Sequence, residues 1–210
     1  MARYREAICR LCRREGQQLF LKGQRCYGQH CPQTKKAYPP GQGGEQRLQR
    51  RRVSDYGKQL REKQKMRYTY GILEKQFRSY VEQAERAQGV TGEVLMQLLE
   101  RRLDNVIYRS GLASSRAESR QLVTHGHFQL NDKRMNVPSA LVRAGDVIKV
   151  KDSSKEAGPF KELKAAAGRP IPEWMTVDYQ NRTVTINAIP SREQIDTQVD
   201  EQQVVEFYSR

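Results

Sequence analysis

The sequence predicts an α+β fold, in which a basic N-terminal arm and a small helical domain precede a domain of short helices and antiparallel strands. Three observations support this prediction. Residues 1–70 carry eighteen Lys and Arg against five Asp and Glu, so they hold most of the chain's net charge of +14. Apolar residues recur at helical spacing over 72–110 and alternate at strand spacing from position 128. All four cysteines lie between positions 9 and 31.

The cysteines form two close pairs, Cys9 with Cys12 and Cys26 with Cys31. This spacing suits a tetrahedral zinc ion, because each pair can supply two thiolates from one side. A structural metal also supplies folding energy to a segment that is too polar to build an apolar core. We therefore predict one structural Zn²⁺ bound by these four cysteines. His30 is an alternative to Cys31 as the fourth ligand, and ordinary buried thiols are the alternative without metal.

The composition excludes several protein classes. The chain has no run of eighteen apolar residues and no apolar signal segment at its N-terminus, so we expect neither a membrane span nor secretion. The apolar fraction is 37%, below the roughly 45–50% of typical globular domains. We therefore expect a cytosolic protein with a modest core.

The N-terminal half is expected to be helical after a linker. Residues 32–45 hold several Pro and Gly and indicate a loop. A basic helix is expected from Asp55 to about Tyr70, with Ser54 as its N-cap. A second helix is expected over 72–88, because its apolar residues recur at helical spacing and Gly89 follows.

The remaining elements change from helical to strand periodicity. The spacing predicts one long helix over 93–110, then a short helix that begins at Ser115 and carries Glu118 at the capping-box position. Strands are expected at 128–131, 135–137, 147–150, 175–179 and 183–189, and Asn131-Asp132-Lys133 indicates a tight turn between the first two.

These elements suggest three parts. Residues 1–45 form the zinc-bearing basic arm, residues 46–92 the helical domain, and residues 93–187 a domain of short helices and strands. We expect residues 188–210 to return to the helical domain, because the apolar strip near the C-terminus needs a cover.

The charge distribution points to a polyanionic partner, with nucleic acid as the leading candidate. A helix N-terminus with Ser114, Ser115 and Arg116 can hold a phosphate, and Arg120 follows on the same face with Arg109 nearby. This chemistry favours recognition of RNA backbone and shape over base reading. A solvated basic tail and a capped helix with solvated arginines are the alternatives without RNA.

The predicted RNA-binding residues all offer a positive charge or a hydrogen-bond donor. They are Arg3, Arg5, Arg14, Lys22, Lys35, Lys36, Arg47, Arg50, Arg51, Arg52, Lys58, Arg61, Arg67, Arg109, Ser114, Ser115, Arg116, Arg120, Gln121, His125 and Lys133.

The segments 102–109 and 115–123 resemble the small RNA-binding module found in some pseudouridine synthases and tyrosyl-tRNA synthetases. Together with Arg3-Tyr4, the loop at 39–42 and the ending at 206–210, the chain resembles the bacterial small-subunit ribosomal protein four family over essentially all of its length. Many members lack the cysteine quartet, and the spacing here matches the zinc-bearing type.

The resemblance implies a non-enzymatic, structural constituent of the small ribosomal subunit in the cytoplasm. It implies a primary rRNA binder that nucleates assembly of the 5′ domain and lies beside the mRNA entry channel. It also implies contact with neighbouring ribosomal protein five, through which decoding accuracy is influenced.

Two other functions share parts of this pattern. An RNA-modifying enzyme could carry the same module, but residues 151–210 are too few for a catalytic domain and no nucleophile–base pair is evident. A zinc-containing DNA-binding regulator is the other alternative, because two short helices before a hairpin can imitate a helix-turn-helix.

Overall fold

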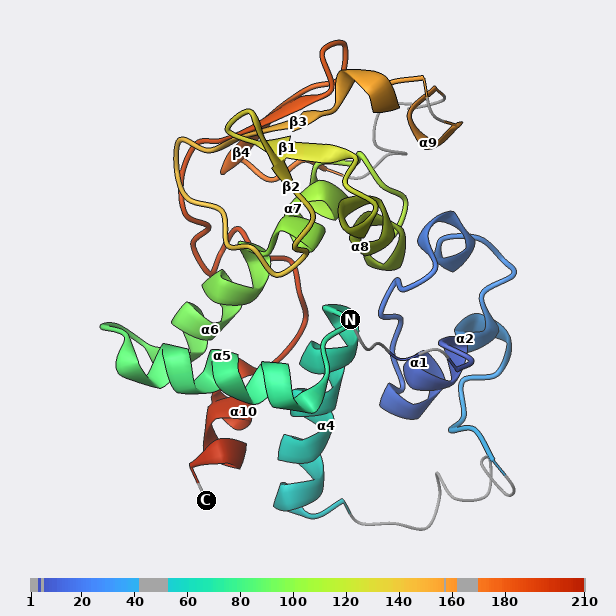
Figure 1. Ribbon diagram of the computed structural model, residues 1–210. Coiled ribbons are helices and arrows are strands. Elements are labelled where there is room, and N and C mark those ends of the chain that lie inside the picture. Colours follow the sequence, from blue (N-terminus) through green and yellow to red (C-terminus); the bar gives the residue numbers. More distant parts are fainter. Residues whose placement is uncertain (1–3, 5, 42–52, 157, 162–169, 210) are drawn as a thin grey trace. The chain divides into compact units, whose positions relative to one another are not determined.

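The computed structural model describes residues 4, 6–41, 53–156, 158–161 and 170–209 (Figure 1). Helices and an antiparallel sheet build the α+β fold that the sequence predicts. The chain divides into two compact units, residues 1–95 with 198–210 and residues 96–197. The finer division into arm, helical domain and RNA-binding domain stays a prediction.

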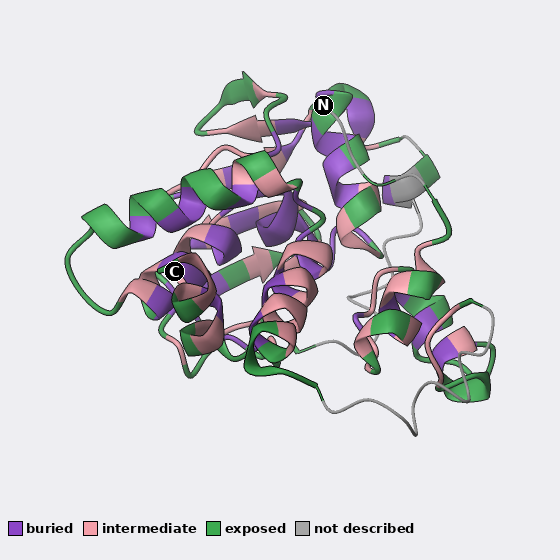
Figure 2. Cartoon of the chain, turned by 90° about the horizontal axis from the view of Figure 1, so that it is seen from below, coloured by how far each residue is buried: buried purple, intermediate pink, exposed green. Residues whose placement is uncertain are grey.

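The first unit is helical. Its elements are α1 (Cys9–Glu15), the 3-10 helix η1 (Gly23–Cys26), α2 (Pro32–Lys35), α4 (Asp55–Thr69), α5 (Glu74–Arg86), the first half of α6 (Thr91–Glu100) and α10 (Glu201–Tyr208). The predicted N-cap of α4 is confirmed, since Ser54 Oγ accepts a hydrogen bond from the Gly57 N–H at 3.2 Å. Helix α5 buries one face, and Figure 2 shows buried and exposed residues alternating along the helices.

Helix α10 packs on α4 and gives this very polar helix an apolar cover. The Phe207 ring lies 5.6 Å from the Tyr56 ring, and Gln59 Nε2 donates to Glu206 Oε2 at 2.9 Å. Tyr208 donates its hydroxyl proton to Glu74 Oε1 at 2.7 Å, which ties α10 to α5 as well. The C-terminal aromatic residues therefore hold helices that are far away in the sequence.

The second unit combines short helices with a five-stranded sheet. Its elements are the second half of α6, α7 (Leu103–Arg109), α8 (Arg116–Thr124), β1 (Phe128–Leu130), β2 (Lys133–Met135), β3 (Val147–Val150), the 3-10 helix η2 (Asp152–Ser154), α9 (Gly158–Lys161), β4 (Met175–Asp178) and β5 (Thr183–Ile186).

The sheet has the order β2-β1-β3-β5-β4, and all its neighbouring strands are antiparallel. The predicted turn between β1 and β2 is confirmed, because Asn131 and Asp132 have φ values of 49° and 62°, as a two-residue hairpin turn requires. Ile148 of β3 pairs with Val184 of β5, and both are fully buried. The buried face packs with α7 and α8 in one apolar cluster that includes Phe128 and Trp174.

The prediction of one continuous helix over 93–110 is wrong, because the helix is interrupted between α6 and α7. Arg102 has an extended backbone with ψ 136° and forms an isolated β-bridge with Leu141. The Leu103 N–H donates to the Ala140 carbonyl at 2.8 Å, and the Arg101 carbonyl accepts from the Val142 N–H at 2.9 Å. The interruption therefore comes from tertiary hydrogen bonds with a segment about 40 residues further along the chain, which the local sequence does not reveal.

Candidate cysteine site and nucleic-acid interface

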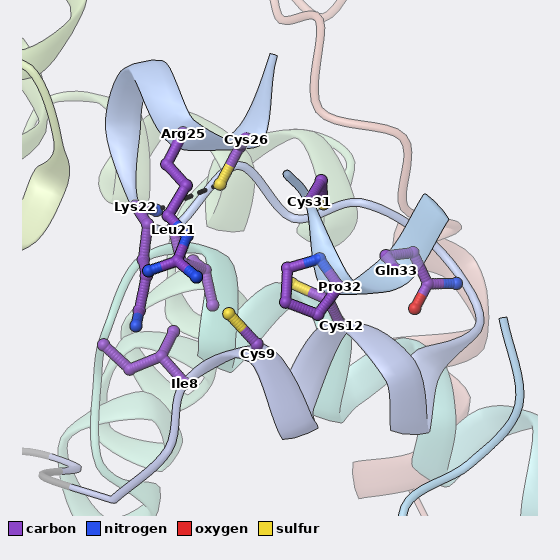
Figure 3. Close-up of a pocket in the computed structure, with 10 residues that line it drawn as sticks. All are labelled: Ile8, Cys9, Cys12, Leu21, Lys22, Arg25, Cys26, Cys31, Pro32 and Gln33. Carbon is purple, nitrogen blue, oxygen red and sulfur yellow. Dashed lines mark hydrogen bonds between the residues drawn. The ribbon is translucent and has the colours of Figure 1, made fainter. Parts of the chain in front are cut away.

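The four cysteines come from three short elements and line one cavity (Figure 3). Cys9 and Cys12 lie on the same face of α1, since they are three residues apart in a helix. Cys26 ends η1, and Cys31 is the N-cap residue of α2. Three of these side chains are buried and Cys9 is half-buried, and no disulfide joins any of them. The two close pairs that the sequence predicts are thus brought together.

Hydrogen bonds shape the loop around these sulfur atoms. The Lys22 N–H donates to Cys26 Sγ at 3.3 Å, and Gln18 Nε2 donates to Cys31 Sγ at 3.7 Å. Burial raises the pKa of the Cys12 and Cys26 thiols, and the neighbouring cysteines add to the increase. A cation that replaces the thiol protons would reverse this effect, because it stabilises the thiolate form.

The ligand types suit zinc, because four thiols lie around one cavity and two of their sulfur atoms accept hydrogen bonds. Its arrangement is not that of a closed site: within the described residues, no three His, Cys, Asp or Glu side chains are placed so that they could hold a metal ion. Binding would therefore require the thiol side chains to turn toward a common point. His30 is exposed and is not among the residues that line the cavity.

Among the described basic residues of the arm, Arg13 makes internal contacts and the others are exposed. Arg13 Nε donates to the carbonyls of Lys36 and Tyr38 at 3.1 and 3.0 Å, and its guanidinium lies 4.8 Å from the centre of the Tyr38 ring. Arg13 therefore fastens the end of the arm to α1. The predicted RNA-binding residues of the described arm are all exposed: Arg14, Lys22, Lys35 and Lys36. Arg3, Arg5, Arg47, Arg50, Arg51 and Arg52 lie outside the described residues.

The cations of α4 are engaged with carboxylates of the same unit. Arg61 Nη1 lies 3.0 Å from Glu15 Oε1, whose side chain is buried, and Arg67 Nη1 lies 3.4 Å from Glu74 Oε2. Lys58 pairs with Asp55 at 3.0 Å and is exposed. Of these three predicted RNA-binding residues, Lys58 is therefore exposed, whereas Arg61 and Arg67 are partly buried.

The N-terminus of α8 is capped as the sequence predicts. Ser115 Oγ accepts from the Glu118 N–H at 3.3 Å. The Glu118 carboxylate in turn accepts from the Ser114 N–H at 2.6 Å and from the Ser114 hydroxyl. This carboxylate occupies the position near the helix N-terminus that the sequence assigned to a phosphate, so RNA has to compete with it there.

The three arginines of the predicted phosphate site lie in internal networks. Arg120 is buried beside Asp104 at 3.3 Å, where Arg102 also contacts the carboxylate at 2.7 Å. Arg120, which the sequence predicts beside the phosphate site, is therefore buried. It is buried because the carboxylate of Asp104 is itself buried and attracts both guanidinium groups.

Arg109 and Arg116 belong to a second network around Glu100 and Asn105. Arg109 Nη2 lies 2.9 Å from Glu100 Oε1 and 2.6 Å from Asp196 Oδ1. Arg116 Nε donates to Asn105 Oδ1 at 2.7 Å, and its guanidinium lies 4.4 Å from the centre of the Tyr108 ring. Arg116 stays half-exposed, so it keeps a surface that RNA can reach.

The exposed donors of the second unit lie mainly after α8. Gln121, His125 and Lys133 are exposed, as the prediction requires. Sequence reasoning missed Arg134 and Arg143, which are exposed as well. Arg134 lies so close to Gly126 that a Cβ at this position would be only 2.8 Å from Arg134 Nη2. The guanidinium of Arg134 thus lies across a backbone that carries no side chain.

Comparisons with known proteins agree along the whole chain. The family described as "Ribosomal protein S4/S9 N-terminal domain" matches residues 3–100, and the family described as "S4 domain" matches residues 101–148. The chain is 57% identical to small ribosomal subunit protein uS4 of Syntrophomonas wolfei over 211 residues. It is 56% identical to uS4A of Symbiobacterium thermophilum over 210 residues and 56% identical to uS4 of Pelotomaculum thermopropionicum over 211 residues.

Each of these alignments covers 100% of both proteins. The chain belongs to the family of bacterial small ribosomal subunit protein uS4.

Proposed function

We propose that this chain is a structural, non-enzymatic constituent of the small ribosomal subunit that binds small-subunit rRNA in the cytoplasm. Its membership of the uS4 family carries this proposal. The exposed cations of the arm and of the second unit supply the chemistry, since phosphate contacts dominate the affinity of proteins for RNA. Among the described residues, no helix is both long and apolar enough to cross a bilayer.

The finer role that we propose is primary binding to the 5′ domain of the rRNA, early in subunit assembly. The test is filter binding of the full chain to a 5′-domain transcript at increasing salt. If about eight phosphates are neutralised, the affinity should fall about 10⁴-fold between about 50 and 200 mM salt. An affinity that does not change with salt contradicts the proposal, and so does stronger binding to duplex DNA than to this transcript.

We further propose contact with neighbouring ribosomal protein five and a place near the mRNA entry channel, where the chain influences decoding accuracy. These proposals rest on family membership alone. Crosslinking within assembled subunits tests both, since the chain should crosslink to that protein and to bound mRNA. Crosslinks to neither partner contradict them.

The third proposal is one structural Zn²⁺ held by Cys9, Cys12, Cys26 and Cys31. The convergence of these four thiols on one cavity supports it. Protein purified without added zinc should contain about one ion per chain, and Cys9→Ser should release it. His30→Ala is the matched control and should retain the ion, because His30 does not line the cavity. A wild-type chain without metal contradicts the proposal.

A further inference from the structure

The arm carries a pair of stacked aromatic rings beside the cysteine site. The ring centroids of Phe20 and Tyr27 are 4.9 Å apart, and the two planes differ by 26°. Phe20 is half-buried, while Tyr27 is 59% exposed. Phe20 thus packs against Tyr27, and Tyr27 is the more exposed residue of the two.

The backbone holds this pair in a conformation that is uncommon for bulky residues. Phe20 has a φ of 50°, in the left-handed region that favours glycine. Such strain persists only where the surrounding structure fixes it, and it concentrates at functional positions. Tyr27 directly follows Cys26, whose sulfur accepts the Lys22 N–H, and the Tyr27 N–H donates to the Gln24 carbonyl at 3.1 Å. The loop that carries Tyr27 is therefore held in place by backbone hydrogen bonds.

The sequence around the two aromatic residues carries only one sign of charge. Residues 16–41 contain four Lys and Arg and no Asp or Glu. Lys22 and Arg25, which belong to the same loop as the two rings, are both exposed. An occupant of the ring face therefore has to bring negative charge together with a flat apolar surface. An unpaired nucleotide has both, in its phosphate and its base.

We propose that Tyr27, supported by Phe20, stacks on an unpaired base of the rRNA while Lys22 and Arg25 contact the adjacent phosphates. This inference rests on the proposed function. It adds a residue that contacts a base to an interface whose other predicted contacts are with phosphates. Aromatic side chains accept any base in this way, because every base has a π face. The contact therefore fixes the position of a single-stranded nucleotide and carries little sequence preference.

The test measures affinity and salt dependence of the full chain on a 5′-domain transcript. Tyr27→Ala should weaken binding about 10-fold and leave the salt slope unchanged, because stacking neutralises no phosphate. Lys22→Ala and Arg25→Ala should each reduce the slope by about one. Tyr56→Ala, which removes a 51% exposed tyrosine elsewhere in the same unit, should change the affinity less than twofold.

Two further variants separate stacking from packing. Tyr27→Leu keeps an apolar cover on Phe20 without a π face, so it should bind as weakly as Tyr27→Ala. Tyr27→Trp should bind normally, and its fluorescence should be quenched by the transcript above the constant signal of the buried Trp174, which is the chain's one tryptophan. Unchanged reactivity of the four cysteines toward a maleimide shows that the arm stays folded in each variant.

Three results overturn the proposal: normal affinity of Tyr27→Ala, normal affinity of Tyr27→Leu, or an equal loss by Tyr27→Ala on fully paired duplex RNA. A wild-type chain that fails to bind the transcript refutes the proposed function instead, so the two failures are distinguishable.

Discussion

The described arm, residues 6–41, and the second unit, residues 96–197, use their basic residues in opposite ways. In the described arm, all the cations of the predicted interface are exposed, and residues 16–41 contain no carboxylate that could pair with Lys22, Lys35 or Lys36. In the second unit, Arg109 and Arg120 are drawn inward by the buried carboxylates of Glu100 and Asp104. An arginine in a basic sequence is therefore available to RNA only where no buried acid competes for it.

The two regions also differ in what keeps them folded. Within residues 6–41, the buried apolar side chains are Leu19 and three cysteines. The second unit instead buries a continuous cluster that includes Phe128, Phe160 and Trp174. We infer that the arm depends on its cysteine site, whereas the second unit is stable through apolar burial and buried ion pairs.

Removal of the proposed zinc ion should produce the largest difference between the regions. Because a structural metal contributes its binding free energy to folding, a chelator should abolish the protection of backbone amides over residues 9–35. The amides of α7, α8 and the sheet should keep theirs. Hydrogen exchange measured on the full chain tests this expectation. Uniform loss of protection along the chain would show that the two regions are not independent.

Asp104→Ala should have the next largest effect, and on the second unit. The substitution leaves the charges of Arg102 and Arg120 buried without their shared carboxylate, which costs about 3–5 kcal/mol. Urea unfolding followed by Trp174 fluorescence measures this loss. Asp132→Asn removes the charge of an exposed carboxylate that pairs with Lys149 and keeps a side chain that tolerates the φ of 62° at this turn, so it should cost less than about 1 kcal/mol. Equal effects of the two substitutions would contradict the structural role of Asp104.

The salt dependence of RNA binding should separate exposed from buried cations. Lys35→Ala combined with Lys36→Ala should lower the salt slope by about two, because both side chains are exposed and free to meet phosphates. Arg120→Ala should leave the slope unchanged and instead reduce the free energy of unfolding. If Arg120→Ala lowers the slope as much as one arm lysine does, RNA binding draws Arg120 out of the core.

The smallest expected effect is a pH dependence of the stability of the first unit. Burial acts to raise the pKa of Glu74, but hydrogen bonds from Lys63 and Tyr208 outweigh it and lower the pKa. A carboxyl group with a lowered pKa stabilises the folded state above its unfolded pKa of about 4.3, and this contribution disappears as the pH falls through the folded value.

Glu74→Gln should therefore flatten the fall in unfolding midpoint between about pH 5 and pH 3. The effect should be modest, because the side chain is 44% exposed. Glu82→Gln on α5 is the control, since Glu82 is exposed and contacts only Arg78 among the described ion pairs. An identical pH profile for wild type and Glu74→Gln would contradict the assignment.

Local signals predicted the elements whose bonds are local. Ser54 and Ser115 cap α4 and α8 because each side chain reaches an amide only three residues away. The β1–β2 turn is also local, since Asn131 and Asp132 tolerate a positive φ. The pairing of cysteines around one cavity follows from their short spacings within residues 9–31.

The features that the sequence did not predict correctly all depend on contacts with residues that are distant in the sequence. The break after Glu100 arises from hydrogen bonds to residues 140–142. Arg61 pairs with Glu15, and Arg120 with Asp104, across 46 and 16 positions. Arg134 was missed because its position against Gly126 follows from the hairpin and not from a motif.

The sequence by itself determined the α+β class, the helix caps, the cysteine quartet and the excess of positive charge, because each depends on composition or on neighbours a few residues apart. Only the tertiary structure decided which cations stay at the surface and which become part of the core. That choice depends on where buried carboxylates lie, and folding alone brings them to the arginines.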